Sequence, residues 1–295
     1  MLNQDSKRGW AFIALLFITA SWGSTFFMIK DLLDRVPAID FLGVRFLACG
    51  ILAATIFAPR LRHIDRRTWI IGGGLGVIYA AAQVLQTVGL AYTDASISGF
   101  ITGMYVVFTP IIAWLLYRNQ LGRKMWMAVA LAAVGLAVLS LRGFSFGYGE
   151  TLTLISSLLF GFHVALIGHY VPGRDALAFT ATQLITCGIV SFLAALPGGV
   201  VLPQRNADIV AIAYMVLIPA LLALILQNWA QQYVTETQAA VTMTSEPVFA
   251  ALFAIGFGGE ALSARTGVGG AIIVAAMLLS QVPARYVPRC LRRKI

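Results

Sequence analysis

The hydrophobic pattern divides the chain into ten apolar runs of about 20 residues, separated by short connections. The runs cover residues 10–30, 38–58, 69–92, 95–117, 124–142, 150–170, 178–197, 207–231, 238–258 and 266–283. A helix of about 20 apolar residues crosses the hydrocarbon core of a bilayer, so each run predicts one transmembrane helix. No connection is long enough for a soluble catalytic domain, and we therefore expect any chemistry to take place within the membrane.

A second pattern is an internal repeat. The stretch at residues 99–116 returns 141 residues later at 240–257, and Ala-Cys-Gly-Ile at 48–51 returns as Thr-Cys-Gly-Ile at 186–189. One repeat holds five runs, and an odd number of membrane crossings places the second copy in the opposite orientation, as in many secondary transporters. We therefore predict an all-α polytopic membrane protein whose ten transmembrane helices form two inverted five-helix repeats, residues 10–143 and 150–283, around a central cavity.

Composition points to the same class. Of the 295 residues 59% are hydrophobic and 11% are charged, and the mean hydropathy is +0.85. A soluble domain needs more polar residues to cover its core. The three cysteines, Cys49, Cys187 and Cys290, lack the spacing of metal ligands, and the first two fall inside apolar runs. We expect no metal site and no cofactor.

The formal net charge of +9 is spread over short connections rather than gathered on one face with interleaved aromatic residues, so it does not indicate a nucleic-acid partner. Most Lys and Arg residues outside the runs fall in alternate connections, on the side of the N-terminus. The positive-inside rule then predicts that both termini are cytoplasmic in a multi-pass protein of the cytoplasmic (inner) membrane. Residues 284–295 would form a basic cytoplasmic tail.

Four motifs occur in order along the chain: Ser21-Trp22-Gly23-Ser24-Thr25-Phe26, Arg45-Phe46, Pro247-Val248-Phe249 and Gly259-Glu260. With the two five-run halves they resemble the EamA family of the drug/metabolite transporter superfamily, over residues 10–283. The resemblance implies a ten-helix bundle around a central cavity and the export of metabolites, often amino acids. The first half departs from the family pattern, because Arg118-Asn119 stands where the family closes its fourth span with Gly-Glu.

Ionisable groups inside apolar runs are costly and commonly face the interior of a helix bundle. Glu246 lies in the middle of the ninth run, directly before Pro247. It can be read as a ligand for a substrate ammonium, as a proton site, or as a buried carboxyl that caps backbone loosened by the proline. Its repeat mate is Tyr105, which offers a ring and a hydroxyl to the same cavity.

Two further ionisable residues lie inside the runs. Arg45 in the second run can be read as a snorkelling or ion-pairing residue or as a substrate contact, with Asp40 as a poorly spaced partner within the same helix. We favour a structural or gating role for Arg45, and Pro247 is assigned a similar role. His163, among aromatic residues of the sixth run, is read either as a hydrogen-bonded core residue or as a proton relay.

Polar side chains recur on single faces of the third and eighth runs, at Tyr79, Gln83 and Gln86 and at Gln227, Asn228 and Gln231. A lipid-facing amide would be unsatisfied, so these bands face neighbouring helices or a wet cavity. With added aromatic and hydroxyl groups, the expected substrate site consists of Trp22, Ser24, Tyr79, Gln83, Gln86, Tyr105, Phe160, His163, Gln227, Asn228, Trp229 and Glu246.

These observations predict a secondary transporter that exports small metabolites, with amino acids as the favoured class, by alternating access. The expected partners are the small-molecule substrate, membrane lipids and protons, and the expected state is a monomer or a weak dimer. The alternatives are a multidrug or other metabolite carrier, a channel and, more remotely, an integral-membrane enzyme. The enzyme reading lacks paired acids, metal-spaced ligands and a nucleophile with a neighbouring base.

Overall fold

The computed structural model describes residues 4–93, 95–118, 121–140, 147–249, 252–253 and 264–281. Every regular element in these ranges is a helix, which confirms the expected all-α fold. In chain order they are α1 (Gln4–Gly23), α2 (Phe26–Leu33), α3 (Ala38–Ile56), α4 (Ala58–Leu61), α5 (Arg66–Ala91), α6 (Ala95–Gly103), α7 (Tyr105–Tyr117), α8 (Arg123–Ser140), α9 (Tyr148–Tyr170), α10 (Ala176–Ala195), the 3₁₀ turn η1 (Leu196–Gly198), α11 (Asn206–Met215), the π-helical η2 (Val216–Leu222), α12 (Ala223–Ala230), α13 (Glu236–Met243) and α15 (Ala264–Gln281).

Several helices are long and apolar enough to cross a membrane. Five such spans occur in the described ranges: Ala38–Ile56, Arg66–Ala91, Tyr148–Tyr170, Ala176–Gly198 and Asn206–Ala230. Shorter apolar helices cover Ile101–Tyr117 and Gly267–Ser280. The chain is thus a polytopic membrane protein, as the hydrophobic runs predicted. The expected basic tail, residues 284–295, and the Gly259-Glu260 motif lie outside the described residues.

Within the described residues, three of the ten expected spans are interrupted away from their ends. The first is broken at Ser24-Thr25, the fourth at Met104 and the ninth at Thr244-Ser245. Hydroxyl groups compete with the helix at two breaks, since Thr25 Oγ1 donates to Trp22 O and Ser245 Oγ donates to Thr242 O. The chain becomes helical again at residues 246–249, where Pro247 has no N–H to continue the earlier ladder.

A different irregularity lies in the eighth span, where η2 contains Pro219 and separates α11 from α12. Its widened turn carries carbonyl groups that contact the first and second spans. Trp22 Nε1 donates to the carbonyl oxygen of Pro219 at 2.9 Å, and Cys49 Sγ lies 3.8 Å from the carbonyl oxygen of Val216. The irregular helix is therefore tied to two other spans through its own backbone.

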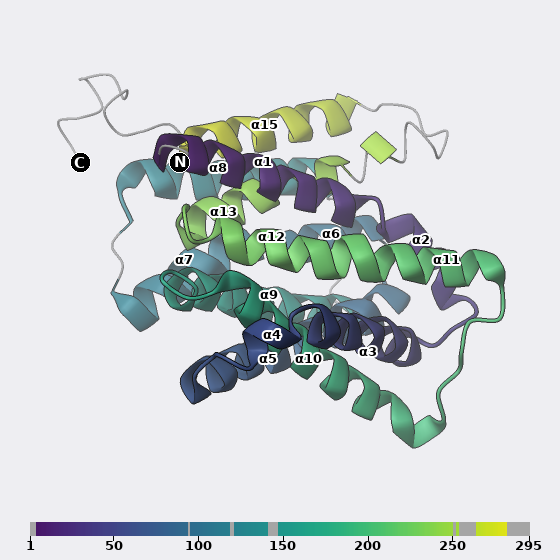
Figure 1. The fold of residues 1–295 in the computed structure, drawn as a ribbon. Helices are drawn as coiled ribbons and strands as arrows, with labels where there is room; N and C mark the ends of the chain where they lie inside the picture. The colour runs from purple at the N-terminus through teal and green to yellow at the C-terminus, as the bar shows by residue number, and fades with distance from the viewer. Residues whose placement is uncertain are drawn as a thin grey trace.

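Helix contacts come in pairs that correspond when the two halves of the chain are exchanged (Figure 1). The second and seventh spans, α3 and α10, pack on each other, and so do the fifth and tenth, α8 and α15. The contact of α5 with α9 has its counterpart in the contact of α1 with α12. The contact of α5 with α10 corresponds in the same way to that of α3 with η2.

The α3–α10 crossing brings the repeated Cys-Gly motif of one half against that of the other. A Cβ atom at Gly188 would lie 2.5 Å from the carbonyl oxygen of Phe46, and one at Gly50 would lie 2.9 Å from that of Leu184. Only glycine allows the two backbones to approach this closely. The crossing is the shared seam of the halves, and it positions residues one turn away, including Arg45, relative to the second half.

Candidate functional site

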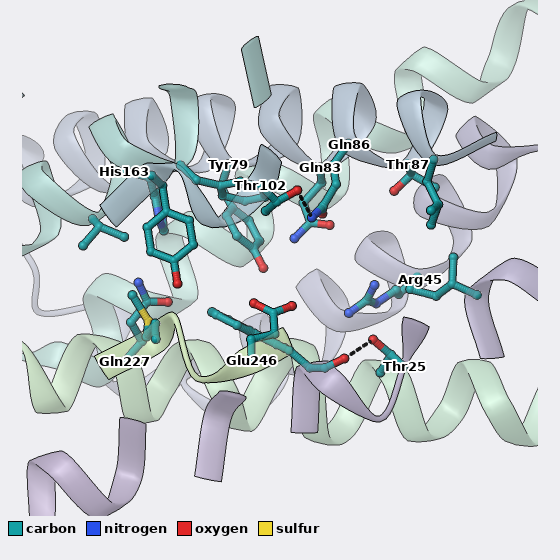
Figure 2. A pocket seen from close by; sticks show the side chains of 17 residues that line it. Thr25, Arg45, Tyr79, Gln83, Gln86, Thr87, Thr102, His163, Gln227 and Glu246 are labelled. Atoms are coloured by element: carbon teal, nitrogen blue, oxygen red, sulfur yellow. Dashed lines mark hydrogen bonds between the residues drawn. The ribbon is translucent and has the colours of Figure 1, made fainter. Parts of the chain in front are cut away.

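A cavity lies between helices of both halves of the chain, with about 790 Å³ of space including the part open to the outside. Figure 2 shows Tyr79, Gln83, Gln86, Thr87 and His163 along one side, with Gln227, Glu246 and Thr25 facing them from the other. Of the residues expected to bind substrate, those that line the cavity are Trp22, Tyr79, Gln83, Gln86, Tyr105, Phe160, His163, Gln227 and Glu246.

The longest wall of the cavity comes from one face of α5. Tyr79, Gln83 and Gln86 lie on it as expected from their spacing, and the same face continues through Thr87 and Leu90. The wall is joined to α6 by a hydrogen bond of 3.2 Å from Gln86 Nε2 to Thr102 Oγ1. An amide band on this helix therefore faces the cavity rather than lipid.

Aromatic rings pack around Tyr79 at the centre of this wall. The Tyr79 ring stacks on His163, with centroids 4.9 Å apart and planes at 29°, and meets Phe160 and Phe46 edge-on at 6.1 and 5.7 Å. Such ring pairs add to the stabilisation that burial provides. They also hold the Tyr79 ring in place, so that the cavity has a rigid aromatic surface.

Glu246 enters the cavity from the opposite side, directly after the break at Thr244-Ser245. Its carboxylate points into the open space (Figure 2). None of the ion pairs within the described ranges involves it. The buried hydroxyl of Tyr105, its repeat mate, has no hydrogen-bond partner there either. The cavity thus offers a carboxylate without an ion pair and a phenol without a hydrogen bond among the described residues.

Arg45 lines one end of the same cavity, although we expected a structural or gating role for it. The residue is only 4% exposed, and its guanidinium lies 5.0 Å from the ring centre of Phe46 and 5.8 Å from that of Phe41. Asp40, the partner considered from the sequence, instead accepts a hydrogen bond of 3.0 Å from the backbone N–H of Val201. Arg45 therefore has aromatic neighbours but no ion pair among the described residues.

His163 belongs to a chain of buried hydrogen bonds that links α9, α10 and α12. Asn228 Nδ2 donates to the carbonyl oxygen of Leu224, so Asn228 Oδ1 is free to accept from Gln183 Nε2 at 3.0 Å. Gln183 Oε1 then lies 2.9 Å from His163 Nε2. Because an amide oxygen can only accept, Nε2 must carry a proton, and neutral His163 keeps Nδ1 as an acceptor.

Three residues of the expected site are not part of the cavity wall. Ser24 faces α11, where its Oγ lies 2.7 Å from Tyr214 Oη. Asn228 is fully buried in the hydrogen-bond chain, and Trp229 packs against Tyr233 with ring centres 5.4 Å apart. Pro247, assigned a gating or structural role, directly follows Glu246 and is the second helical residue after the break. Neighbouring positions on a helix differ by about 100° in direction, which explains how Gln227 and Asn228 diverge.

The cavity wall also contains residues that sequence reasoning missed. They are Thr25, Ile29, Thr87, Leu90, Thr102, Val164 and Met243. Helical spacing was a usable signal for several of them, because Thr25 and Ile29 follow Trp22 by three and seven positions. Thr102 could not be found in this way, since its place depends on how α6 packs on α5. Within the described ranges no group of three or more His, Cys, Asp or Glu side chains could hold a metal ion.

An all-helical membrane fold with a cavity between helices of both halves of the chain is the architecture typical of secondary membrane transporters. Comparison with known proteins agrees with this class. A sequence model of the EamA-like transporter family matches residues 9–141 and, a second time, residues 147–281. The chain belongs to this family.

Two relatives that match along most of the chain are named as transporters. An uncharacterized transporter of Archaeoglobus fulgidus is 34% identical over 280 residues, which cover 92% of this chain and 86% of the relative. The uncharacterized inner membrane transporter YedA of Escherichia coli K12 is 26% identical over 277 residues, covering 91% and 89%. A crystal structure with a TM-score of 0.79 and 14% identity covers 94% of this chain and 98% of its own, which shows that the fold is shared.

Proposed function

We propose that this transporter exports small metabolites, with amino acids as the favoured class, across the cytoplasmic membrane. The observation that carries the proposal is the carboxylate of Glu246, which has no ion pair among the described residues, inside a cavity of aromatic rings and amides. A carboxylate in such a place binds a substrate ammonium group, while the rings of Tyr79 and Phe160 accommodate an apolar side chain. The direction of transport rests on the family and on the expected orientation, with both termini in the cytoplasm.

Alternating access is the proposed mechanism, in two inverted halves that rock about the cavity. Two features support it. The three helix breaks lie beside the cavity, at Thr25, next to Tyr105 and before Glu246, as in transporters whose discontinuous helices surround the site. At one end of the bundle, Arg35 joins the end of α2 to Asp208 of α11. A contact of this kind can break and form again as the halves move.

A second candidate is a multidrug carrier for organic cations. Its support is the apolar part of the wall, where Ile29, Leu90 and the flexible Met243 can adapt to several shapes. The same carboxylate of Glu246 would then bind the cation. The two functions predict different substrates. An amino acid carries a carboxylate in addition to its ammonium group, whereas the substrate of a multidrug carrier needs only the positive charge.

The test is efflux from liposomes that contain purified protein and a panel of labelled amino acids, with and without a pH gradient. We expect saturable efflux of some amino acids, and at least a tenfold slower efflux for Glu246→Gln, because a charge-assisted hydrogen bond contributes about 1.5–3 kcal/mol. Glu150→Gln is the matched control, since Glu150 accepts hydrogen bonds from Thr93 and Gly147 at the start of α9, away from the cavity.

The panel also separates the rival functions. Efflux of organic cations without efflux of any amino acid would favour the multidrug carrier and contradict the amino-acid proposal. An efflux rate that changes with the pH gradient would indicate proton coupling. An efflux rate that is the same with and without the pH gradient would indicate transport down the substrate gradient alone. Flux without saturation or exchange would point to a channel.

A further inference from the structure

The cavity contains two opposite charges that do not neutralise each other. Arg45 comes from α3 in the first half, and Glu246 follows α13 in the second. In the described part of the chain the ion pairs join Arg35 to Asp31 and Asp208, and Arg60 to Asp175, so the two charged groups of the cavity are in none of them. Figure 2 shows the Arg45 guanidinium and the Glu246 carboxylate directed into the same space.

A buried guanidinium without an ion-pair partner has a high desolvation cost. Arg45 is 4% exposed, and its Nε has no hydrogen-bond partner within the described ranges. The rings of Phe41 and Phe46 lie at cation–π distance but supply no acceptor for the N–H groups. Buried charges are normally paired, and intramembrane ones mark substrate or ion pathways. The guanidinium is a planar fork whose geometry matches a carboxylate, so an anionic ligand group is the partner that fits it.

The surface between the two charges favours one kind of occupant. Tyr79 and Phe160 present rings, and the amides of Gln83 and Gln86 continue the α5 face. A simple cation would pair with Glu246 and leave Arg45 unpaired, and a simple anion would do the reverse. A ligand with both charges pairs with both residues and leaves no net charge in the low-dielectric site.

We propose that the cavity binds zwitterions at two points, with the substrate carboxylate on Arg45, the ammonium on Glu246 and the side chain against Tyr79 and Phe160. Arg45 thereby adds affinity for the zwitterion over the simple amine, and Glu246 adds affinity for the zwitterion over the simple acid. This inference rests on the proposed function and deepens it, because it assigns the specificity of the same site to one residue from each half.

The test is competition binding to the purified full chain in detergent, against a labelled amino acid that the liposome panel identifies. The competitors share one side chain: the free amino acid, its decarboxylated amine and its deaminated acid. For the wild type we expect the free amino acid to bind at least tenfold tighter than either analogue. Arg45→Gln should weaken the amino acid and the acid at least tenfold and leave the amine unchanged. Glu246→Gln should weaken the amino acid and the amine and leave the acid unchanged.

Controls keep the result interpretable. Arg45→Lys keeps the positive charge but loses the planar, bidentate geometry of the guanidinium. Its affinity for the acid should lie between those of the wild type and Arg45→Gln. Arg62→Gln removes an exposed guanidinium outside the cavity and should change no affinity. Each variant is first checked for a single elution peak and a sharp melting transition, and Arg45→Lys replaces Arg45→Gln where the latter does not fold.

The crossed pattern decides the outcome. If Arg45→Gln weakens amine and acid equally, or weakens neither, the two-point inference is overturned while the export of amino acids stands. If the wild type binds and moves no amino acid at all, the proposed function itself fails, and the two-point site fails with it.

Discussion

Arg35 holds Asp208 in a bidentate ion pair across 173 positions of sequence: Nε donates to Oδ2 at 3.1 Å and Nη2 donates to Oδ1 at 2.6 Å. Asp208 lies in the first turn of α11 and its side chain is only 7% exposed, whereas Asp31, the second partner of Arg35, is 71% exposed. Bidentate pairs are the strongest of the charge-assisted hydrogen bonds. The pair therefore ties the end of the first span to the start of the eighth.

Arg35→Ala should lower the melting temperature of the detergent-solubilised protein by several degrees, because the little-exposed Asp208 loses its only bidentate partner among the described residues. Asp31→Asn removes the exposed partner alone and should have a much smaller effect. Equal melting temperatures for the two variants would contradict the importance assigned to the α2–α11 contact. Differential scanning fluorimetry of both variants is sufficient for the comparison.

Trp22→Phe should destabilise the protein by about 1–2 kcal/mol, since it removes the hydrogen bond of 2.9 Å to the carbonyl oxygen of Pro219 and part of the buried ring. The matched variant is Trp229→Phe, whose ring packs on Tyr233 rather than on η2. Thermal or chemical unfolding in detergent measures both. If the two substitutions cost the same, the hydrogen bond to the π-helical segment adds nothing beyond ring burial.

Gln183→Leu should cost about 2–4 kcal/mol, because it leaves both the His163 N–H and Asn228 Oδ1 buried without a partner. Gln204→Leu, at an exposed position between α10 and α11, should be nearly neutral. Nitrogen-15 spectra of the wild type should show the tautomer of His163 that is protonated at Nε2. A tautomer protonated at Nδ1 would show that the amide of Gln183 is turned the other way.

Gly188→Ala should destabilise the protein by about 1–3 kcal/mol, because the added Cβ meets the backbone of Phe46 and pushes α3 and α10 apart. Gly74→Ala is the control, since a Cβ there has nothing within 4 Å and removes the entropy cost of glycine in a helix. It should be neutral or stabilising by up to about 1 kcal/mol. If the free energy of unfolding falls in Gly188→Ala and is unchanged or rises in Gly74→Ala, the close approach of the two halves is confirmed.

Asp175 gives a prediction about pH. Burial acts to raise the pKa of its carboxyl, but hydrogen bonds from Arg60 and from the backbone N–H groups of Leu177 and Ala178 hold the pKa below its ordinary value. A lowered pKa in the folded state stabilises the fold above the ordinary carboxyl pKa of about 4, and this stabilisation is lost as the pH falls through the lowered value.

Asp175→Asn keeps the helix cap and loses the charge, so its melting temperature should lie slightly below that of the wild type at neutral pH. The gap should close as the pH falls below about 4. Melting curves of both proteins over this range measure it. A difference in melting temperature that grows at low pH would contradict a lowered pKa of Asp175 in the folded protein.

Much of the cavity could be predicted from local patterns, and the residues show why. Tyr79, Gln83 and Gln86 share one face of α5 because their spacing follows the helical repeat, and the structure places all three at the cavity. The same reasoning continued by one turn would have added Leu90. It failed for Ser24 and Trp229, whose polarity or size suggested the cavity while their direction on the helix points to α11 and to Tyr233.

The partners of the charged groups could not be predicted in this way. Asp40 is five residues from Arg45 in sequence, yet it pairs with the backbone of Val201, 161 positions away, and Arg45 is left to the cavity. Gln183 links His163 to Asn228 across three helices, although no spacing in the sequence relates these residues. Such contacts depend on the crossing of whole helices.

The apolar runs, the internal repeat and the membership of a transporter family follow from the order of residues, because hydrophobic periodicity and similarity are local properties of a chain. The closeness of α3 and α10 at Gly50 and Gly188, and the absence of a described hydrogen-bond partner for Arg45 Nε, arise only when the helices pack. Packing determines these features because a buried polar group is stabilised or left unsatisfied by whatever distant segment lies against it.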